Sequence, residues 1–153
     1  LSSAASDVYK RQRGLFILGS DDQEAGVGDQ LADFVIQNHI QGTLIQCMYF
    51  VPGTPVYEAN RDRLLHQDWS KYNGNAVHFP RRMTPYQLQL EHIRASRKIY
   101  SWRRLFSALV REDPIHKLLF LGEFFWHMSV RSDLKKELPY LKRISEQAAC
   151  APH

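Results

Sequence analysis

The chain has 153 residues, 44% hydrophobic and 24% charged, with a formal net charge of +4. This length suits a single domain with a real core, and the composition is that of an ordinary globular protein. The only two cysteines, Cys47 and Cys150, exclude a disulfide scaffold and most metal sites built from cysteines alone. Because Cys47 lies in an apolar run and no signal-peptide pattern follows the basic N-terminal residues, we predict a cytoplasmic location.

Residues 1–12 show neither helical nor strand periodicity, and the first residue is Leu1 rather than methionine. The segment Ser6–Gln12 resembles the translated sequencing-adapter tail that is often fused to open reading frames at the ends of metagenomic contigs. We therefore expect residues 1–12 to be non-native and exclude them from fold reasoning. A native bacterial protein would then continue upstream of Arg13, with this chain as its C-terminal piece.

The next segment predicts one βαβ unit. Gly14–Gly19 is a short apolar run typical of a buried strand, and Ser20–Asp22 supplies suitable caps for a following helix. Apolar residues then recur at helical spacing from Val27 to Ile40, and Thr43–Phe50 forms a second apolar run. Parallel strands require such a crossover, so we expect a right-handed unit with both strands in one parallel sheet.

Beyond Glu58 the pattern becomes polar and then helical. We predict a short helix, an ordered loop and a brief extended segment over Ala59–Leu65, His66–Asn75 and Ala76–Phe79. Thr84 as N-cap and Pro85 at the first helical position then predict a helix that reaches about Leu109.

Asp113-Pro114 ends that helix, and two further helices are predicted over Ile115–Val130 and Ser132–Arg143, before a frayed tail. Ile115–Val130 is apolar around most of its girth but carries Lys117 and Glu123, so it is too interrupted to span a membrane. It must pack on the protein itself, on a partner or at a membrane interface.

The C-terminal half is basic, with 14 Lys and Arg against 6 Asp and Glu between residues 81 and 143. Such a surface can bind phosphates or an anionic membrane, or it can simply be the solvated side of several helices. The basic residues are spread along the helices rather than clustered, which favours the solvated surface.

No self-contained catalytic or metal-binding motif is present. The sequence lacks a Walker loop, a Gly-x-Ser-x-Gly elbow and a His-Glu-x-x-His helix, and its seven histidines form no ligand set. His116 and His127 are interpreted as polar positions on a packed helix. We therefore assign no catalytic residue and no metal ligand to this chain.

Two candidate binding sites follow the predicted strands. Gly19 would let a ligand approach the backbone, and Asp21 and Asp22 could accept hydrogen bonds from ribose or ammonium groups; helix capping is the alternative. The second strand leaves through Pro52, Gly53 and Thr54, which form either a ligand-binding loop or a tight turn. Since adjacent parallel strands end at the same edge, we expect the two loops side by side.

Four segments occur in an order and spacing that resemble one family: Phe16–Asp22, Gln46–Tyr57, Arg63–Tyr72 and Arg82–Pro85. They look like the C-terminal part of radical S-adenosylmethionine (SAM) enzymes of the cobalamin-binding-domain group. The resemblance covers roughly residues 13–101. At Ser20 the chain departs from the bulkier residue usual in that family.

The resemblance implies that residues 13–60 are the last βαβ unit of an incomplete (β/α) barrel and that residues 61–153 form a loop and a basic helical extension. It implies SAM, a four-iron iron–sulfur cluster and possible cobalamin as cofactors of the parent protein, with Gly19, Asp21, Asp22, Pro52, Gly53 and Thr54 near the bound ligand. The cluster ligands and the cobalamin domain would belong to the missing N-terminal part.

We therefore expect the parent to carry out radical methylation or rearrangement of an unactivated carbon, and the fragment itself to be inactive. Its partners would be the missing barrel half and cobalamin domain and a small-molecule or lipid substrate, with no nucleic acid. The alternative is a helical interaction module that binds a protein or an anionic membrane surface through residues 105–143.

Overall fold

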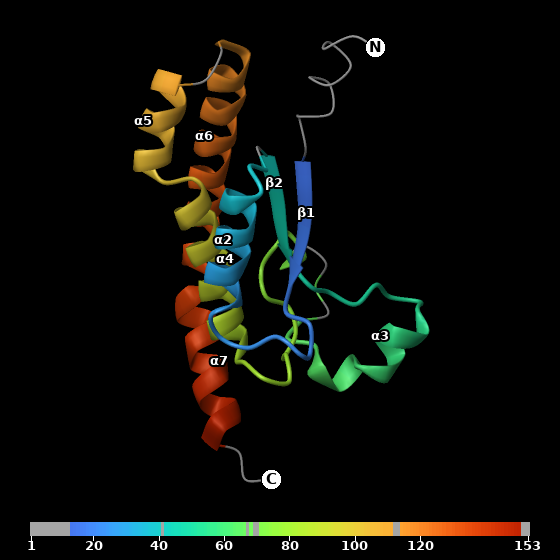
Figure 1. Ribbon diagram of the computed structural model, residues 1–153. Coiled ribbons are helices and arrows are strands. Elements are labelled where there is room, and N and C mark those ends of the chain that lie inside the picture. Colours follow the sequence, from blue (N-terminus) through green and yellow to red (C-terminus); the bar gives the residue numbers. More distant parts are fainter. Residues whose placement is uncertain (1–12, 41, 67, 69–70, 112–113, 151–153) are drawn as a thin grey trace.

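A computed structural model describes residues 13–40, 42–66, 68, 71–111 and 114–150. Strands β1 (Arg13–Leu18) and β2 (Gly42–Cys47) pair in parallel and are joined by helix α2 (Val27–Gln37), as Figure 1 shows. The predicted βαβ unit is confirmed. Both strands end earlier than expected, at Leu18 and Cys47, so the residues beyond them belong to the loops.

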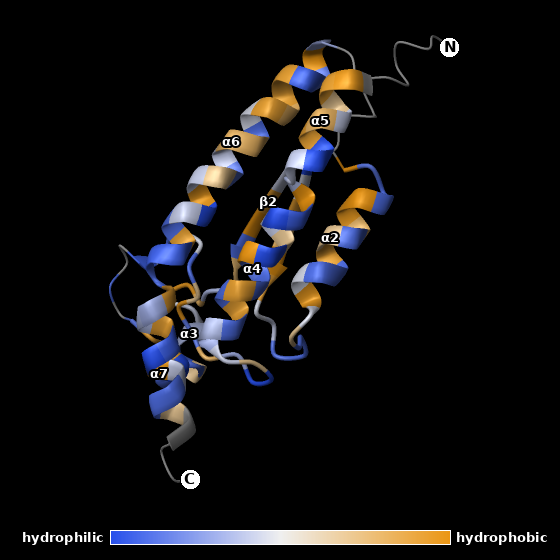
Figure 2. Cartoon of the chain, turned by 90° about the vertical axis from the view of Figure 1, so that its left-hand side faces the viewer, coloured by the Kyte–Doolittle hydropathy of each residue, from blue (hydrophilic) through white to orange (hydrophobic). Residues whose placement is uncertain are grey.

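The helices cover only one face of this sheet. Leu18, Ile45 and Cys47 point to the covered face and are buried, and Figure 2 shows the helices lying in front of the strands. On the opposite face Leu15 and Ile17 remain 74% and 62% exposed. These two side chains and Leu44 are the exposed apolar residues of an uncovered sheet face, which also carries Gln46.

The prediction that Ser20, Asp21 or Asp22 caps the first helix is wrong. Helix α2 begins at Val27, seven residues beyond Ser20, and its N-cap is Gly26, which makes no side-chain capping bond. Asp21 instead forms ion pairs with arginines from later in the chain.

The segment after β2 also begins differently from its prediction. Helix α3 spans Pro55–Ala59, because the Thr54 side chain accepts the Tyr57 N–H, and a 3-10 turn follows at Arg61–Arg63. The predicted helix over Ala59–Leu65 is therefore wrong. The extended segment predicted at 76–79 is confirmed by an antiparallel bridge between Leu64 and His78.

Helix α4 (Pro85–Ile99) starts as predicted, with a complete capping box between Thr84 and Gln87. It does not continue to Leu109 as expected. The chain leaves the helix at Tyr100, whose hydroxyl accepts the Thr43 N–H at 3.0 Å, and α5 (Trp102–Arg111) begins anew. A buried bond to β2 thus ends a helix that local propensity would have extended.

The C-terminal helices are longer than predicted. Helix α6 runs without a break over Pro114–Lys136, and α7 covers Leu138–Cys150, so the expected boundary at Ser132 and the expected frayed tail from Ser145 are wrong. Pro114 begins α6, while its neighbour Asp113 lies outside the described residues. In the described ranges no helix combines the length and the apolar character needed to cross a membrane.

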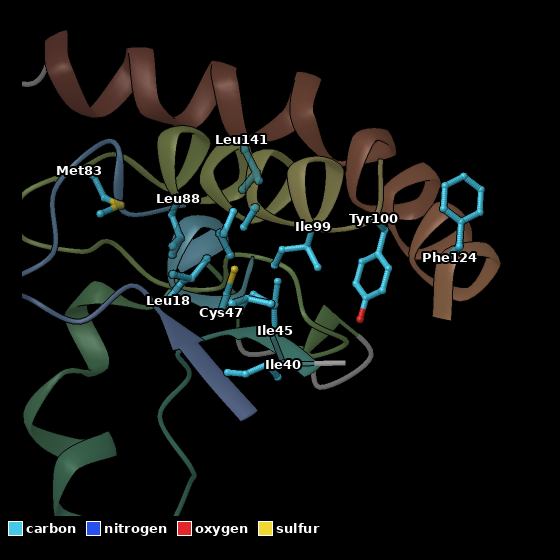
Figure 3. Close-up of a cluster of buried hydrophobic side chains, with 14 of the residues drawn as sticks. Leu18, Ile40, Ile45, Cys47, Met83, Leu88, Ile99, Tyr100, Phe124 and Leu141 are labelled. Carbon is cyan, nitrogen blue, oxygen red and sulfur yellow. The ribbon is translucent and has the colours of Figure 1, made fainter. Parts of the chain in front are cut away.

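One hydrophobic core joins both strands with α2, α4, α5, α6 and α7. Figure 3 shows Leu18 and Cys47 from the strands facing Leu88 and Ile99 of α4, with Leu141 of α7 above them in this view. The core therefore includes residues from both predicted parts of the chain, 13–60 and 61–153. Helix α4 occupies the middle of this arrangement, since it packs on α2, on both strands, on α6 and on α7.

A buried polar network ties α6 to the sheet. The Nε2 atom of His127 lies 3.0 Å from the Thr43 carbonyl oxygen and must donate to it, so Nδ1 accepts from the Ser96 hydroxyl at 3.2 Å. The ring also stacks on Tyr100 at 4.0 Å. Burial lowers the pKa of His127, which keeps this imidazole neutral and suited to both bonds. The interpretation of His127 as a packed helix position is confirmed.

Truncating the centre of the core tests this packing. The Leu88→Ala variant should lose about 3 kcal/mol of unfolding free energy, because Leu88 is fully buried between α4 and the strands. Urea denaturation followed by circular dichroism measures the loss. The matched control is Leu15→Ala, on the uncovered sheet face, which should change stability by less than about 0.5 kcal/mol. Equal losses in the two variants would contradict the fold.

Candidate functional site

The two loops named from the sequence lie at the same end of the sheet. β1 and β2 run parallel with Leu18 opposite Cys47, and the Met48 N–H continues the ladder by donating to the Leu18 carbonyl oxygen at 2.6 Å. The residues after both strands therefore leave from one edge, the lower end of the sheet in Figure 1. In α/β proteins this carboxyl edge is where ligands bind.

The structure explains why a glycine occupies position 19, which its sequence context did not reveal. Its φ is 101°, and a Cβ atom there would lie 2.8 Å from the Leu88 side chain and 3.2 Å from the His78 ring. The space beside Gly19 is thus filled by the protein itself. The Gly19 N–H donates to the Gln23 side chain at 2.7 Å, which fixes the loop.

Asp21 is held by two arginines from elsewhere in the chain. The Arg63 guanidinium donates to both carboxylate oxygens of Asp21, and Arg81 lies 3.1 Å away. The hydrogen bond from Arg63 is the main cause that lowers the pKa of Asp21 below its ordinary 3.8. Asp21 therefore carries a full negative charge at neutral pH. Asp22, beside it, is exposed.

Arg63 contacts several residues near this edge of the sheet and holds them together. Besides Asp21 it binds the Phe79 carbonyl oxygen through Nε at 3.0 Å and Nη2 at 2.8 Å, and the Asn60 side chain through Nη1 at 2.8 Å. Its guanidinium carbon also lies 5.8 Å from the centroid of the Phe50 ring. The planar fork of arginine can satisfy these partners at once, whereas a lysine could not.

His78 contacts the same edge from the interior of the protein. It is fully buried, its Nε2 donates to the Gly19 carbonyl oxygen at 3.1 Å, and its ring meets Phe50 edge-on at 5.1 Å. Burial is the main cause that lowers the pKa of His78, so the ring is neutral at pH 7. Its Nδ1 atom has no hydrogen-bond partner within the described residues.

The exit from β2 is an open turn followed by a helix cap. Gly53 is exposed with a φ of 76°, a backbone conformation that glycine adopts without strain. The Thr54 hydroxyl donates to the Val51 carbonyl oxygen at 2.6 Å and accepts the Tyr57 N–H at 3.2 Å. Pro52 is half-buried beside it. The tight turn, which the sequence analysis gave as the alternative to a ligand-binding loop at Pro52–Thr54, is therefore present.

The six predicted residues divide into two groups. The Gly19 amide, the Asp21 carboxylate and the Thr54 hydroxyl are engaged within the chain and hold the loops in place. Asp22 and the Gly53 backbone face outward at the carboxyl edge, with Pro52 between the exposed Val51 and Gly53. Ligand binding by these residues stays a prediction.

Sequence reasoning assigned no role to Arg63, His78 or Arg81. Arg63 opens one of the four quoted segments, so its position was visible, but its bond to Asp21 spans 42 residues and has no local signature. His78 was placed only in a brief extended segment. Both roles depend on the pairing of residues 77–79 with residues 63–65 and on the contact of His78 with Gly19.

The remaining buried titratable pair is structural. Cys47 Sγ lies 3.8 Å from His92 Nδ1; burial raises the pKa of the thiol to about 12 and lowers that of the imidazole to about 4. Both groups are neutral at pH 7, which argues against a reactive thiolate. Across the described ranges, no group of three His, Cys, Asp or Glu side chains is placed to hold a metal ion.

Two curated proteins from Chlorobaculum tepidum are similar in sequence. The chain is 30% identical over 102 residues to bacteriochlorophyllide d C-12(1)-methyltransferase, covering 64% of this chain and 22% of the relative. It is 30% identical over 80 residues to bacteriochlorophyllide d C-8(2)-methyltransferase, covering 50% and 18%. The chain thus spans about a fifth of the relatives it matches. No protein-family model and no solved structure matches it.

The chain is therefore distantly homologous to two proteins that are named as methyltransferases. Both matches cover a minor part of each relative, so the homology concerns one region of those enzymes.

The ion pairs of Asp21 predict a defined pH dependence. Since the pKa of Asp21 is lowered in the folded state, its stabilising effect is present above the ordinary value of 3.8 and is lost as pH falls through the folded value. The Asp21→Asn variant should melt below the unmodified chain at pH 7, and the difference should shrink progressively as pH falls below about 4. Melting temperatures measured at a series of pH values test this. Asp22→Asn is the matched control, and a difference for Asp21→Asn that is constant with pH would contradict the assignment.

Proposed function

We propose that residues 13–153 form the C-terminal part of a radical SAM enzyme that methylates an unactivated carbon, and that this part is inactive alone. The proposal rests on the uncovered sheet face, combined with a methyltransferase match that spans about a fifth of each relative. The resemblance of four segments to the cobalamin-binding-domain group supports the radical chemistry.

The uncovered sheet face fits the interior of an incomplete barrel. In a (β/α) barrel, helices pack outside each strand pair while the inner face meets side chains from other strands. β1 and β2 have helices on one face only, and Leu15, Ile17 and Leu44 on the other face are 74%, 62% and 42% exposed. We propose that the other barrel strands of the parent protein cover these side chains.

The proposed cofactors divide between the two parts of the parent. The described residues contain no set of metal ligands, so the iron–sulfur cluster would be held by cysteines in the N-terminal part. The carboxyl edge of β1 and β2 would contribute outward-facing groups, Asp22 and the Gly53 backbone, to the wall of a SAM site. Arg63 and His78 would fix the shape of that wall rather than contact the cofactor.

Extending the gene upstream gives the first test of the proposal. The longer reading frame should encode a Cys-x-x-x-Cys-x-x-Cys segment, and the full-length protein, anaerobically reconstituted with iron and sulfide and then reduced, should convert SAM to 5′-deoxyadenosine. A variant with one of these cysteines replaced by alanine is the control and should not. A full-length gene without the three cysteines would refute the proposal.

A second prediction concerns the sheet face itself. Ile17→Asp should lower the melting temperature of the full-length protein, because a carboxylate would be buried without a partner among the barrel side chains. The same substitution in the 153-residue chain should leave stability nearly unchanged and reduce aggregation, since Ile17 is 62% exposed there. Val56→Asp on α3, 54% exposed, is the matched control. An Ile17→Asp full-length protein as stable as the control would show that nothing covers this face.

A further inference from the structure

Helix α5 and the first half of α6 carry a second apolar surface, remote from the sheet face. Figure 1 shows this helical pair toward the amino ends of the strands, whereas the candidate site lies at their carboxyl ends. Ten of the seventeen large exposed hydrophobic side chains in the described part of the chain lie on these two helices, so they dominate its exposed apolar surface. We call this the hairpin surface, consisting of the exposed apolar residues of 102–128.

The apolar stripe of α5 is only partly used for packing. Leu105 is buried against the core, but Trp102, Phe106 and Val110 are 58%, 63% and 80% exposed. These positions follow one another at helical spacing on one side of α5. The helix is therefore strongly amphipathic, with most of its apolar side turned away from the protein.

Helix α6 continues the same surface. Phe124 and His127 point inward and are buried, while five apolar residues on the outer side stay more than half exposed. These five are Ile115, Leu118, Leu119, Phe125 and Trp126. The two helices pack through ring contacts, because the Trp102 ring centroid lies 4.7 Å from that of the buried Phe124, which in turn lies 5.6 Å from that of Phe125. The hairpin surface thus extends over two helices that contact each other.

The charges that flank the hairpin surface are basic. Arg103 is exposed and Arg104 and Lys117 are half-exposed, and among the described residues no Asp or Glu occurs on α5 or on α6 before Glu123. Glu123 is itself paired with Arg13. Glu112 and Asp113, between the two helices, lie outside the described residues.

We propose that the hairpin surface binds the surface of an anionic lipid bilayer, with α5 and the first half of α6 lying in the plane of the headgroups. Apolar stripes with tryptophan beside arginine and lysine are the composition of in-plane amphipathic helices, and each basic residue gains from anionic lipid. In the described ranges no helix could span the membrane, so the contact is one of surface binding.

A second copy of the chain fits the hairpin surface less well than an anionic bilayer does. A symmetric contact would place the same patch on both subunits and bring the flanking arginines toward each other. The described part of the surface offers no acidic side chain to neutralise them. An anionic bilayer supplies both the apolar phase and the negative charge.

Vesicle flotation of the 153-residue chain tests the proposal, which does not rest on the proposed enzymatic function. The chain should float with vesicles of phosphatidylcholine mixed with phosphatidylglycerol and much less with phosphatidylcholine alone, and added salt should weaken the binding. The paired change Phe106→Ser and Val110→Ser should lower partitioning by about tenfold. Arg103→Glu with Lys117→Glu should lower it by about fivefold or more for each site.

The matched control is the pair Leu15→Ser and Ile17→Ser, which removes apolar side chains of similar exposure from the sheet face. These variants should float like the unmodified chain. Equal losses in the sheet and hairpin variants, flotation that ignores lipid charge, or no flotation would overturn the proposal. So would sedimentation velocity showing a dimer that Phe106→Ser and Val110→Ser abolish, with flotation unchanged.

Discussion

The close contact between α2 and α4 is the constraint on which the rest of the structure depends. A Cβ atom at Gly28 would lie 2.3 Å from the Glu91 carbonyl oxygen, so only glycine lets the two helices approach. The Gly28 N–H donates to the Glu91 carboxylate at 2.8 Å, and Arg94 donates to its other oxygen. Because a carboxylate that is 1% exposed needs such partners, the contact fixes both the distance and the register of α4 on the βαβ unit.

With α4 in place, both ends of the sheet are determined. Near its start, Leu88 packs with His78 against Gly19 and so shapes the carboxyl edge where Arg63 reaches Asp21. At its end, the chain turns at Tyr100 to bond with Thr43, and His127 from α6 binds the same residue. The fixed geometry of the candidate site and the position of the helical pair therefore share one cause, the buried face of α4.

The two exposed apolar surfaces differ in chemistry, and the difference indicates different partners. The exposed apolar side chains of the sheet face are all aliphatic, namely Leu15, Ile17 and Leu44, as expected of a surface completed by other strands. The hairpin surface is rich in aromatic side chains and is flanked by arginine and lysine, which suits a boundary between apolar and polar phases. One surface is proposed to complete a fold and the other to bind lipid.

The sequence by itself determined the βαβ unit, the cap at Thr84 and the burial of Cys47, because these depend on local spacing, capping chemistry and apolar runs. Only the tertiary structure decided that α4 stops at Ile99, that Asp21 pairs with Arg63 instead of capping α2, and which sides of α5 and α6 remain uncovered. Each of these results from groups dozens of residues apart: Tyr100 with Thr43, Asp21 with Arg63. Periodicity shows that a helix has an apolar side, but packing decides whether anything covers it.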